Sequence, residues 1–142
     1  MIVAEGVNDI TQPREPRSAG AHVCLPHLPI SAAGMIADYR GAIRRIHAHG
    51  LRAIGATITP FGRYPYWTPA IETERRRINR WIRTSRAFDG VIDFDRVLRD
   101  PAHPAWLNPT YDSGDGLHPN NGGHAVMAGA IPLSLFTGRA GG

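Results

Sequence analysis

Residues 51–59 read LRAIGATIT, an apolar run of strand length that the following proline ends. Segments with helical spacing of apolar residues flank this run, at 31–49 and at 68–84. Two more short apolar runs, Ile2–Ala4 and Val91–Phe94, predict buried strands beyond those helices. Strands that alternate with helices are typical of a parallel sheet, because parallel strands need long crossover connections. The stretch and its surroundings therefore predict an α/β fold.

Both flanking helices carry recognisable end signals. Ser31 is a favourable N-cap residue, and Gly50 is a favourable residue just past a helix end. Thr68 followed by Pro69 is a typical helix start. A further helix is expected from about Asn121. The expected apolar stripes are Ile36, Tyr39, Ile43 and Ile46 on the first helix and Ile71, Ile78, Trp81 and Ile82 on the second.

The length of 142 residues is typical of one domain. We expect residues 1–142 to form a single domain, with residues 137–142 as a disordered tail. No apolar run approaches the roughly 20 residues of a membrane-spanning helix, so no membrane span is expected. Met1 is not followed by a basic and then apolar signal segment, and the sequence leaves the location of the protein open.

All 16 basic residues are arginine, and the formal net charge is +4. A basic chain can bind nucleic acid, and the densest run, Arg75–Arg83, is the candidate segment for such binding. Its arginines alternate with apolar residues at helical spacing, and aromatic residues are not interleaved as a base-stacking surface requires. We therefore interpret the run as a solvated helix face and expect no nucleic-acid partner.

Cys24 is the single cysteine, so an internal disulfide is impossible. His22 and His27 lie near it in the proline-rich segment Thr11–Pro29, which is expected to be irregular. No second cluster of Cys and His completes a tetrahedral ligand set. We expect no metal site.

The residues with the strongest chemical signal lie in Asp112–Asn120, which reads DSGDGLHPN. Gly, Pro and Asn are turn formers, so this segment is expected to be a loop. Within it Asp115 precedes His118 by three residues, and the two side chains can meet if the loop curls. A carboxylate that accepts from one imidazole nitrogen leaves the other nitrogen free as a general base. The alternative is a polar surface loop with an exposed histidine.

Two other segments follow predicted strands, where ligand sites of parallel sheets lie. Asn8 follows the first strand and has a side-chain amide that can donate to a developing oxyanion. Tyr64, Tyr66 and Trp67 follow the second strand. These aromatic residues either line a substrate cleft or cover the end of the core, and the sequence favours neither.

The segments that contain Asn8 and the Asp115–His118 pair resemble those of a known family, the SGNH (GDSL-type) serine hydrolases. Residues 6–9, GVND, are similar to the third sequence block of that family. Residues 115–119, DGLHP, are similar to its fifth block, in which Asp and His are separated by two residues. The resemblance extends from about Ile2 to Phe136.

The resemblance implies a flavodoxin-like fold, a three-layer α/β/α arrangement around a five-stranded parallel sheet. It also implies hydrolysis of carboxylic esters, acyl or acetyl, by a Ser-His-Asp triad. On this pattern His118 is the general base, Asp115 orients it, and Asn8 contributes to the oxyanion hole. No metal or organic cofactor is implied, and the substrate would be a small-molecule or carbohydrate ester.

The nucleophile block of the family, which carries Gly-Asp-Ser, has no counterpart here. None of the serines stands in that context: Ser18, Ser31, Ser85, Ser113 and Ser134. We therefore expect an N-terminally truncated SGNH domain with about three strands. The strand Ile2–Glu5 would then have an open edge, which is a possible site of self-association.

A different class of function fits the same residues. The chain could be a non-catalytic remnant that binds a carbohydrate or a protein through the aromatic loop Phe61–Trp67.

Overall fold

The computed structural model describes residues 1–11 and 30–137. In chain order its elements are β1 (Ile2–Val3), α1 (Val7–Thr11), α2 (Ala32–Ala48), β2 (Ile54–Ala56), α3 (Pro69–Thr84), β3 (Gly90–Ile92), α4 (Phe94–Leu98), α5 (Asn121–Gly129) and α6 (Ser134–Thr137). Within these ranges no helix combines the length and the hydropathy that crossing a bilayer requires. Cys24, its neighbouring histidines and residues 138–142 lie outside the described residues.

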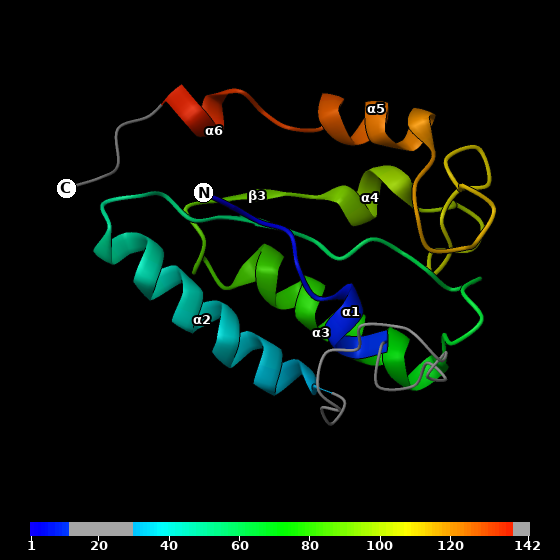
Figure 1. Cartoon of the computed structure of the whole chain (residues 1–142), viewed down its shortest axis with the longest axis horizontal. Coiled ribbons are helices and arrows are strands. Elements are labelled where there is room, and N and C mark those ends of the chain that lie inside the picture. The colour runs from blue at the N-terminus through cyan, green and yellow to red at the C-terminus, as the bar shows by residue number, and fades with distance from the viewer. Residues whose placement is uncertain (12–29, 138–142) are drawn as a thin grey trace, which may run out of the picture.

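The three strands form one parallel sheet in the order β1–β2–β3. Ile54 of β2 lies opposite Ile2 on one side and opposite Gly90 on the other. Figure 1 shows α1, α2 and α3 on one face of the sheet and α5 and α6 on the other. The predicted α/β/α arrangement with three parallel strands is therefore confirmed.

Two cores lie on opposite faces of the sheet. Ile54 and Ala56 pack with Ile92 and Phe94 in the small core under α5 and α6. The intervening Gly55 faces the other way, where an added Cβ would lie only 2.5 Å from the Phe88 ring. The larger core lies between the sheet and α1, α2 and α3, and its fully buried members include Ala53, Phe61, Ile78 and Ile82.

The two long helices begin where their capping residues predict. The Ser31 hydroxyl accepts a hydrogen bond from the Gly34 N–H at 3.2 Å, and the Thr68 hydroxyl accepts one from the Ile71 N–H at 3.2 Å. Gly50, just past α2, takes φ +67°, a conformation that favours glycine.

The buried stripe of α2 differs from the prediction at one position. Met35 is buried in place of Ile36, which is half-buried. Met35, Tyr39 and Ile43 are spaced by four residues, so they lie on one side of the helix and continue to Ile46.

The strands are shorter than predicted, and one is less buried. Ile2 is 41% exposed because, among the described strands, β1 lies at the edge and pairs with β2 alone. In β2, Ile54 and Gly55 pair with both neighbouring strands, and Ala56 pairs with β3 alone. β3 ends before Asp93 because that side chain accepts from the Arg96 N–H and caps α4. The residues after Gly6 form α1.

The arginine run of α3 is not the uniformly solvated face that the sequence predicted. Arg75 is only 2% exposed. Its guanidinium lies 2.8 Å from Glu72 and 2.7 Å from Asp95, and it also donates to the Ile58 carbonyl at 3.0 Å. A buried charge is tolerated when its partners neutralise it and accept its hydrogen bonds. Helical periodicity alone cannot reveal such partners, because Asp95 and Ile58 come from distant segments.

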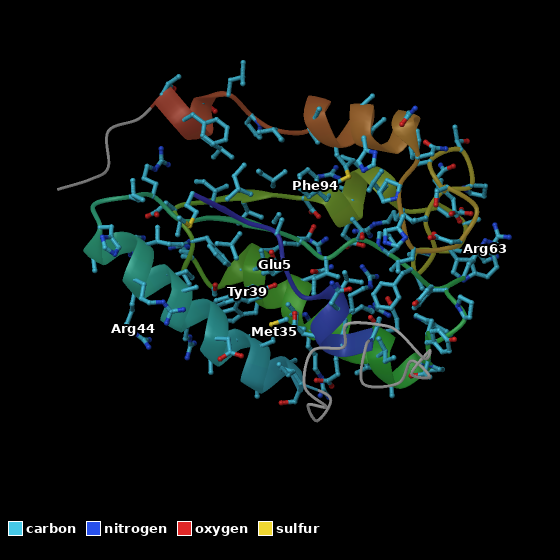
Figure 2. The ribbon with its side chains drawn as sticks, viewed as in Figure 1. Glu5, Met35, Tyr39, Arg44, Arg63 and Phe94 are labelled. Atoms are coloured by element: carbon cyan, nitrogen blue, oxygen red, sulfur yellow. The ribbon has the colours of Figure 1, made fainter. Side chains whose placement is uncertain are left out.

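Gly6 turns the chain from β1 into α1 with φ +124°. An added Cβ would lie 2.8 Å from Ile58 Cδ1 and 2.9 Å from Met35 Cε. The Tyr39 hydroxyl, which donates to the Glu5 carbonyl at 2.6 Å, closes the remaining side. Glu5, Met35 and Tyr39 can be followed in Figure 2. Both the backbone conformation and the surrounding atoms therefore require glycine at this position.

Gly6→Ala is expected to lower the free energy of unfolding by about 2–4 kcal/mol, because it adds backbone strain to steric overlap. Urea unfolding followed by circular dichroism measures the loss. Gly129→Ala is a matched control, because no heavy atom lies within 4 Å of its Cβ position. That change should be neutral or slightly stabilising. Equal unfolding midpoints for the two variants would contradict the account of Gly6.

Candidate active site

The loop Asp112–Asn120 curls, as its turn-forming residues predict. The Asp112 carboxylate accepts hydrogen bonds from the N–H groups of Gly114 at 2.8 Å and Gly116 at 3.0 Å. The two glycines adopt φ of +107° and +74°, which side chains disfavour. The backbone is thereby folded around one carboxylate, and the next acidic residue is turned toward the histidine.

Asp115 and His118 are in direct contact. Nδ1 of His118 lies 2.6 Å from Oδ2 of Asp115. The other carboxylate oxygen accepts from the backbone N–H groups of Leu117 at 2.9 Å and His118 at 2.8 Å. The histidine side chain is 69% exposed and the aspartate side chain is 45% exposed. The pair is therefore well ordered by hydrogen bonds while remaining open to solvent.

The electrostatics of the pair determine which nitrogen carries the proton. Partial burial raises the pKa of Asp115. Hydrogen bonds from the His118 ring and from two backbone N–H groups lower it by more, so the pKa lies well below its ordinary 3.8. The carboxylate is therefore ionised and can only accept, so Nδ1 of His118 donates to it. In a neutral imidazole that donates from Nδ1, Nε2 has a free lone pair, which is the arrangement that a general base requires.

The loop is anchored on both sides of this pair. Gly116 packs against the backbone of Arg63, whose carbonyl carbon would lie 2.5 Å from an added Cβ. Leu117 is buried in the larger core. The Asn120 amide donates to the carbonyls of Thr110 at 3.0 Å and Asp112 at 3.1 Å. The histidine loop is thus held by contacts with the aromatic loop, with the larger core and with the residues before it.

Asn120 has a second function that sequence reasoning missed. Its side-chain oxygen accepts from the Gly123 N–H at 2.9 Å and caps α5. An Asn directly before a predicted helix is a recognised start signal and could have revealed this role.

His118 lines a cavity of about 210 Å³ at the carboxyl ends of the three strands. Ligand sites of open α/β sheets lie at this edge. The same cavity is lined by Glu5 after β1, Thr57 and Thr59 after β2, and His124 and Met127 of α5. The α5 residues were not predicted, because only the packing of that helix over the sheet brings them there.

Asn8 lies in α1, directly after Val7, which lines the same cavity as His118. It is exposed. Within residues 1–11 and 30–137, no hydrogen bond joins Asn8 to His118. The structure therefore brings the start of α1 to the cavity without a hydrogen bond between these two side chains.

In the aromatic loop, two residues pack against the core and one of them also lines a cavity. Tyr64 and Trp67 pack against the larger core. Tyr64 also lines a cavity of about 400 Å³ together with Asp115 and Gly116. The ring of Tyr66 meets that of Tyr64 edge-on, with centroids 5.4 Å apart. Tyr64 is thus the aromatic residue placed beside the histidine loop, whereas Trp67 contributes to the core.

Among the described residues, no cluster of three or more His, Cys, Asp or Glu side chains is placed to hold a metal ion.

Residues 1–126 match the model of the GDSL-like lipase/acylhydrolase family. The chain belongs to this family. The match includes the Asp115–His118 loop and the segment after β1. No curated protein sequence matches this family member.

Two solved structures share its fold. One is a GDSL-like lipase from Bacteroides thetaiotaomicron, with a TM-score of 0.72 and 14% sequence identity. The other, from Bacteroides fragilis, is designated an acylhydrolase and has a TM-score of 0.67 and 16% identity. Each alignment covers 95% of this chain but 60% of the solved chain. The present chain thus spans less than two thirds of the length of either protein.

Proposed function

We propose that this GDSL-like family member acts in the hydrolysis of carboxylic esters, with His118 as general base and Asp115 as the residue that orients it. The observation that carries the proposal is the 2.6 Å contact between Nδ1 of His118 and a carboxylate whose pKa is lowered. Family membership supports a general acylhydrolase role. The Asp115–His118 pair also supports it, because His118 lines a cavity and its Nε2 is not engaged by Asp115.

Within residues 1–11 and 30–137, no hydrogen bond joins a serine hydroxyl to His118. Among the described serines, Ser31 accepts the capping hydrogen bond of α2. Ser113 lies on the histidine loop itself, between Asp112 and Gly114, and does not follow a strand. We propose that the nucleophilic serine belongs to a segment that these 142 residues do not include.

The proposed reaction proceeds in two balanced steps. Nε2 of His118 takes the proton from the serine hydroxyl as its oxygen attacks the ester carbonyl, and the protonated imidazole then gives that proton to the departing alcohol. Water, activated by the same nitrogen, releases the acid and restores the serine. In both steps the negative charge on the carbonyl oxygen requires N–H donors, and the side-chain amide of Asn8 is our candidate for one of them.

The state of the base can be tested in the chain as it stands, by nitrogen NMR of the imidazole at neutral pH. We expect His118 to carry its proton on Nδ1 and to lose this preference in Asp115→Asn, because an amide can donate to Nδ1 and no longer forces it to donate. His103 is the internal control, because its Nδ1 lies 3.7 Å from Asp100, too far for a normal hydrogen bond. A proton on Nε2 of His118 in the unmodified chain would contradict the proposal.

A further inference from the structure

Another cleft lies along α3, away from the histidine loop. Its volume is about 540 Å³, and it lies between α3, α4 and the segment that contains Pro104 and Ala105. None of its lining residues also lines the cavity of His118. Its charged lining residues are the carboxylates Glu72 and Asp95 and the arginines Arg75, Arg76, Arg80, Arg83 and Arg99.

Three of these arginines are neutralised within the fold. Arg75 pairs with Glu72 at 2.8 Å and with Asp95 at 2.7 Å. Asp95 also pairs with Arg99 at 2.8 Å. Arg83 pairs with Asp93, just outside the cleft, at 2.7 Å. The carboxylates around the cleft are therefore already engaged by other cations.

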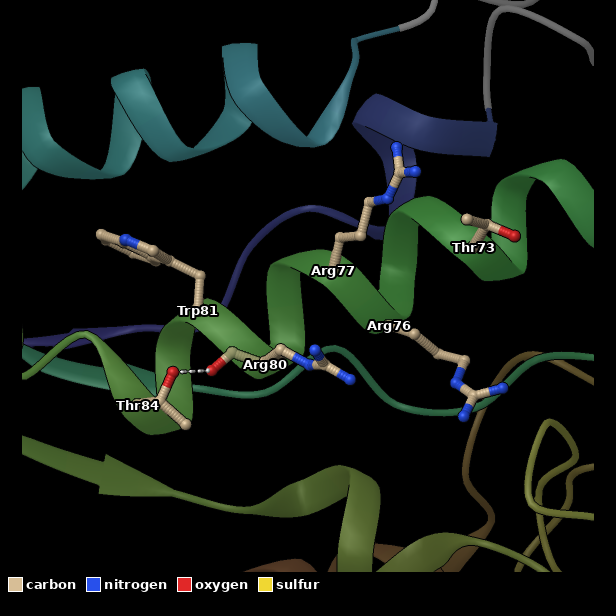
Figure 3. Close-up of a pocket in the computed structure, with 6 residues that line it drawn as sticks. All are labelled: Thr73, Arg76, Arg77, Arg80, Trp81 and Thr84. Carbon is tan, nitrogen blue, oxygen red and sulfur yellow. Dashed lines mark hydrogen bonds between the residues drawn. The ribbon is translucent and has the colours of Figure 1, made fainter.

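Arg76 and Arg80 have no such partner. Among the described residues, neither forms an ion pair. Both side chains are exposed and line the cleft. Figure 3 shows them leaving α3 on a different side from Arg77, which pairs with Glu74 at 3.0 Å. Two positive charges in the cleft thus have no counter-charge from residues 1–11 and 30–137.

The spacing of these two arginines is slightly destabilising when no anion is bound. They are four residues apart on one helix, where like charges repel. Four residues of α-helix rise by about 6 Å, so one compact anion can contact both guanidinium groups. Guanidinium groups bind phosphate and sulfate oxygens through paired N–H donors, a geometry that favours these anions over a simple halide.

We propose that this cleft binds a small molecule that carries phosphoryl or sulfo groups with at least two negative charges. Pro104 and Ala105 form one wall of the cleft, and two of its cations have no ion-pair partner among the described residues, which suits a compact ligand. An extended nucleic-acid backbone would require more unpaired cations along an open surface. The proposal does not depend on ester hydrolysis at His118.

The test uses inorganic pyrophosphate as the probe, titrated into the chain by isothermal calorimetry at low ionic strength. We expect saturable binding that the double variant Arg76→Gln/Arg80→Gln weakens by roughly tenfold or more, because two charged donors are lost. The matched control is Arg44→Gln/Arg45→Gln, which removes two exposed charges from α2, outside the cleft. This control should change the affinity less than twofold after correction for ionic strength, and circular dichroism verifies that both variants are folded.

Three results would overturn the proposal. One is the absence of saturable pyrophosphate binding to the unmodified chain. Another is an equal loss of binding in the two double variants, which would indicate attraction by net charge alone. The third is salt-sensitive binding of duplex DNA without binding of pyrophosphate, which would assign the arginines to a nucleic-acid surface.

Discussion

His118→Ala is expected to lower kcat for p-nitrophenyl acetate by roughly 10²–10⁴-fold in a form of the protein that also contains the nucleophilic serine, because general-base catalysis contributes a factor of this size. Asp115→Asn should also lower kcat, by at most about 10⁴-fold, because it removes the carboxylate that orients the imidazole. We expect the smaller loss for Asp115→Asn, since the Asp115 side chain is 45% exposed and solvent can partly replace it. KM should change little in either variant, since neither side chain is expected to dominate ground-state binding.

Two controls make this expectation specific. His103→Ala removes an exposed histidine that stacks on Trp106, away from the cavity of His118, and should leave kcat unchanged. The 142-residue chain without the serine should hydrolyse the ester no faster than its His118→Ala variant. Turnover by this chain alone that disappears in His118→Ala would contradict the proposal that the nucleophile lies elsewhere.

Asp95→Asn is expected to lower the free energy of unfolding by about 3 kcal/mol. Asp95 is 4% exposed and its carboxylate pairs with Arg75, Arg83 and Arg99. Removing one charge from a buried ion pair typically costs about 3–5 kcal/mol, because the partner remains buried without compensation. We expect the lower end of that range, since Glu72 continues to neutralise Arg75.

The comparison for this variant is Arg77→Gln, which breaks an ion pair at the surface of the same helix. The Arg77 side chain is 67% exposed, and such pairs contribute about 0–1 kcal/mol. Urea unfolding of both variants at one pH and ionic strength measures the difference. A loss in Asp95→Asn no larger than that in Arg77→Gln would show that the ion network adds little net stability.

Features that depend on neighbouring residues were predictable from the sequence. The starts of α2 and α3 follow from Ser31 and from Thr68 with Pro69, because a cap satisfies N–H groups only a few residues away. The contact between Asp115 and His118 is similar, because the turn that joins them is formed by residues of the same loop. The order of strands and helices, and hence the parallel sheet, also follows from local patterns.

Features that depend on distant residues required the tertiary structure. Helical periodicity predicts a surface position for Arg75 because it depends only on which residues are polar. The burial of Arg75 depends on its partners Asp95 and the Ile58 carbonyl, which come from other parts of the chain. Met35 is buried in place of Ile36 because the sheet determines which side of α2 faces inward.

The same distinction applies to the candidate active site. The sequence by itself determined an Asp–His pair in a curled loop and an α/β frame that carries it, because turn formation, capping and strand alternation act over a few residues. Only the tertiary structure decided that His124, Met127 and the ends of β1 and β2 line one cavity with His118. It also decided that two arginines of α3 have no ion-pair partner among the described residues. These arrangements arise when helices pack on the sheet. The contacts that stabilise this packing join residues far apart in the chain, so no local pattern in the sequence reveals them.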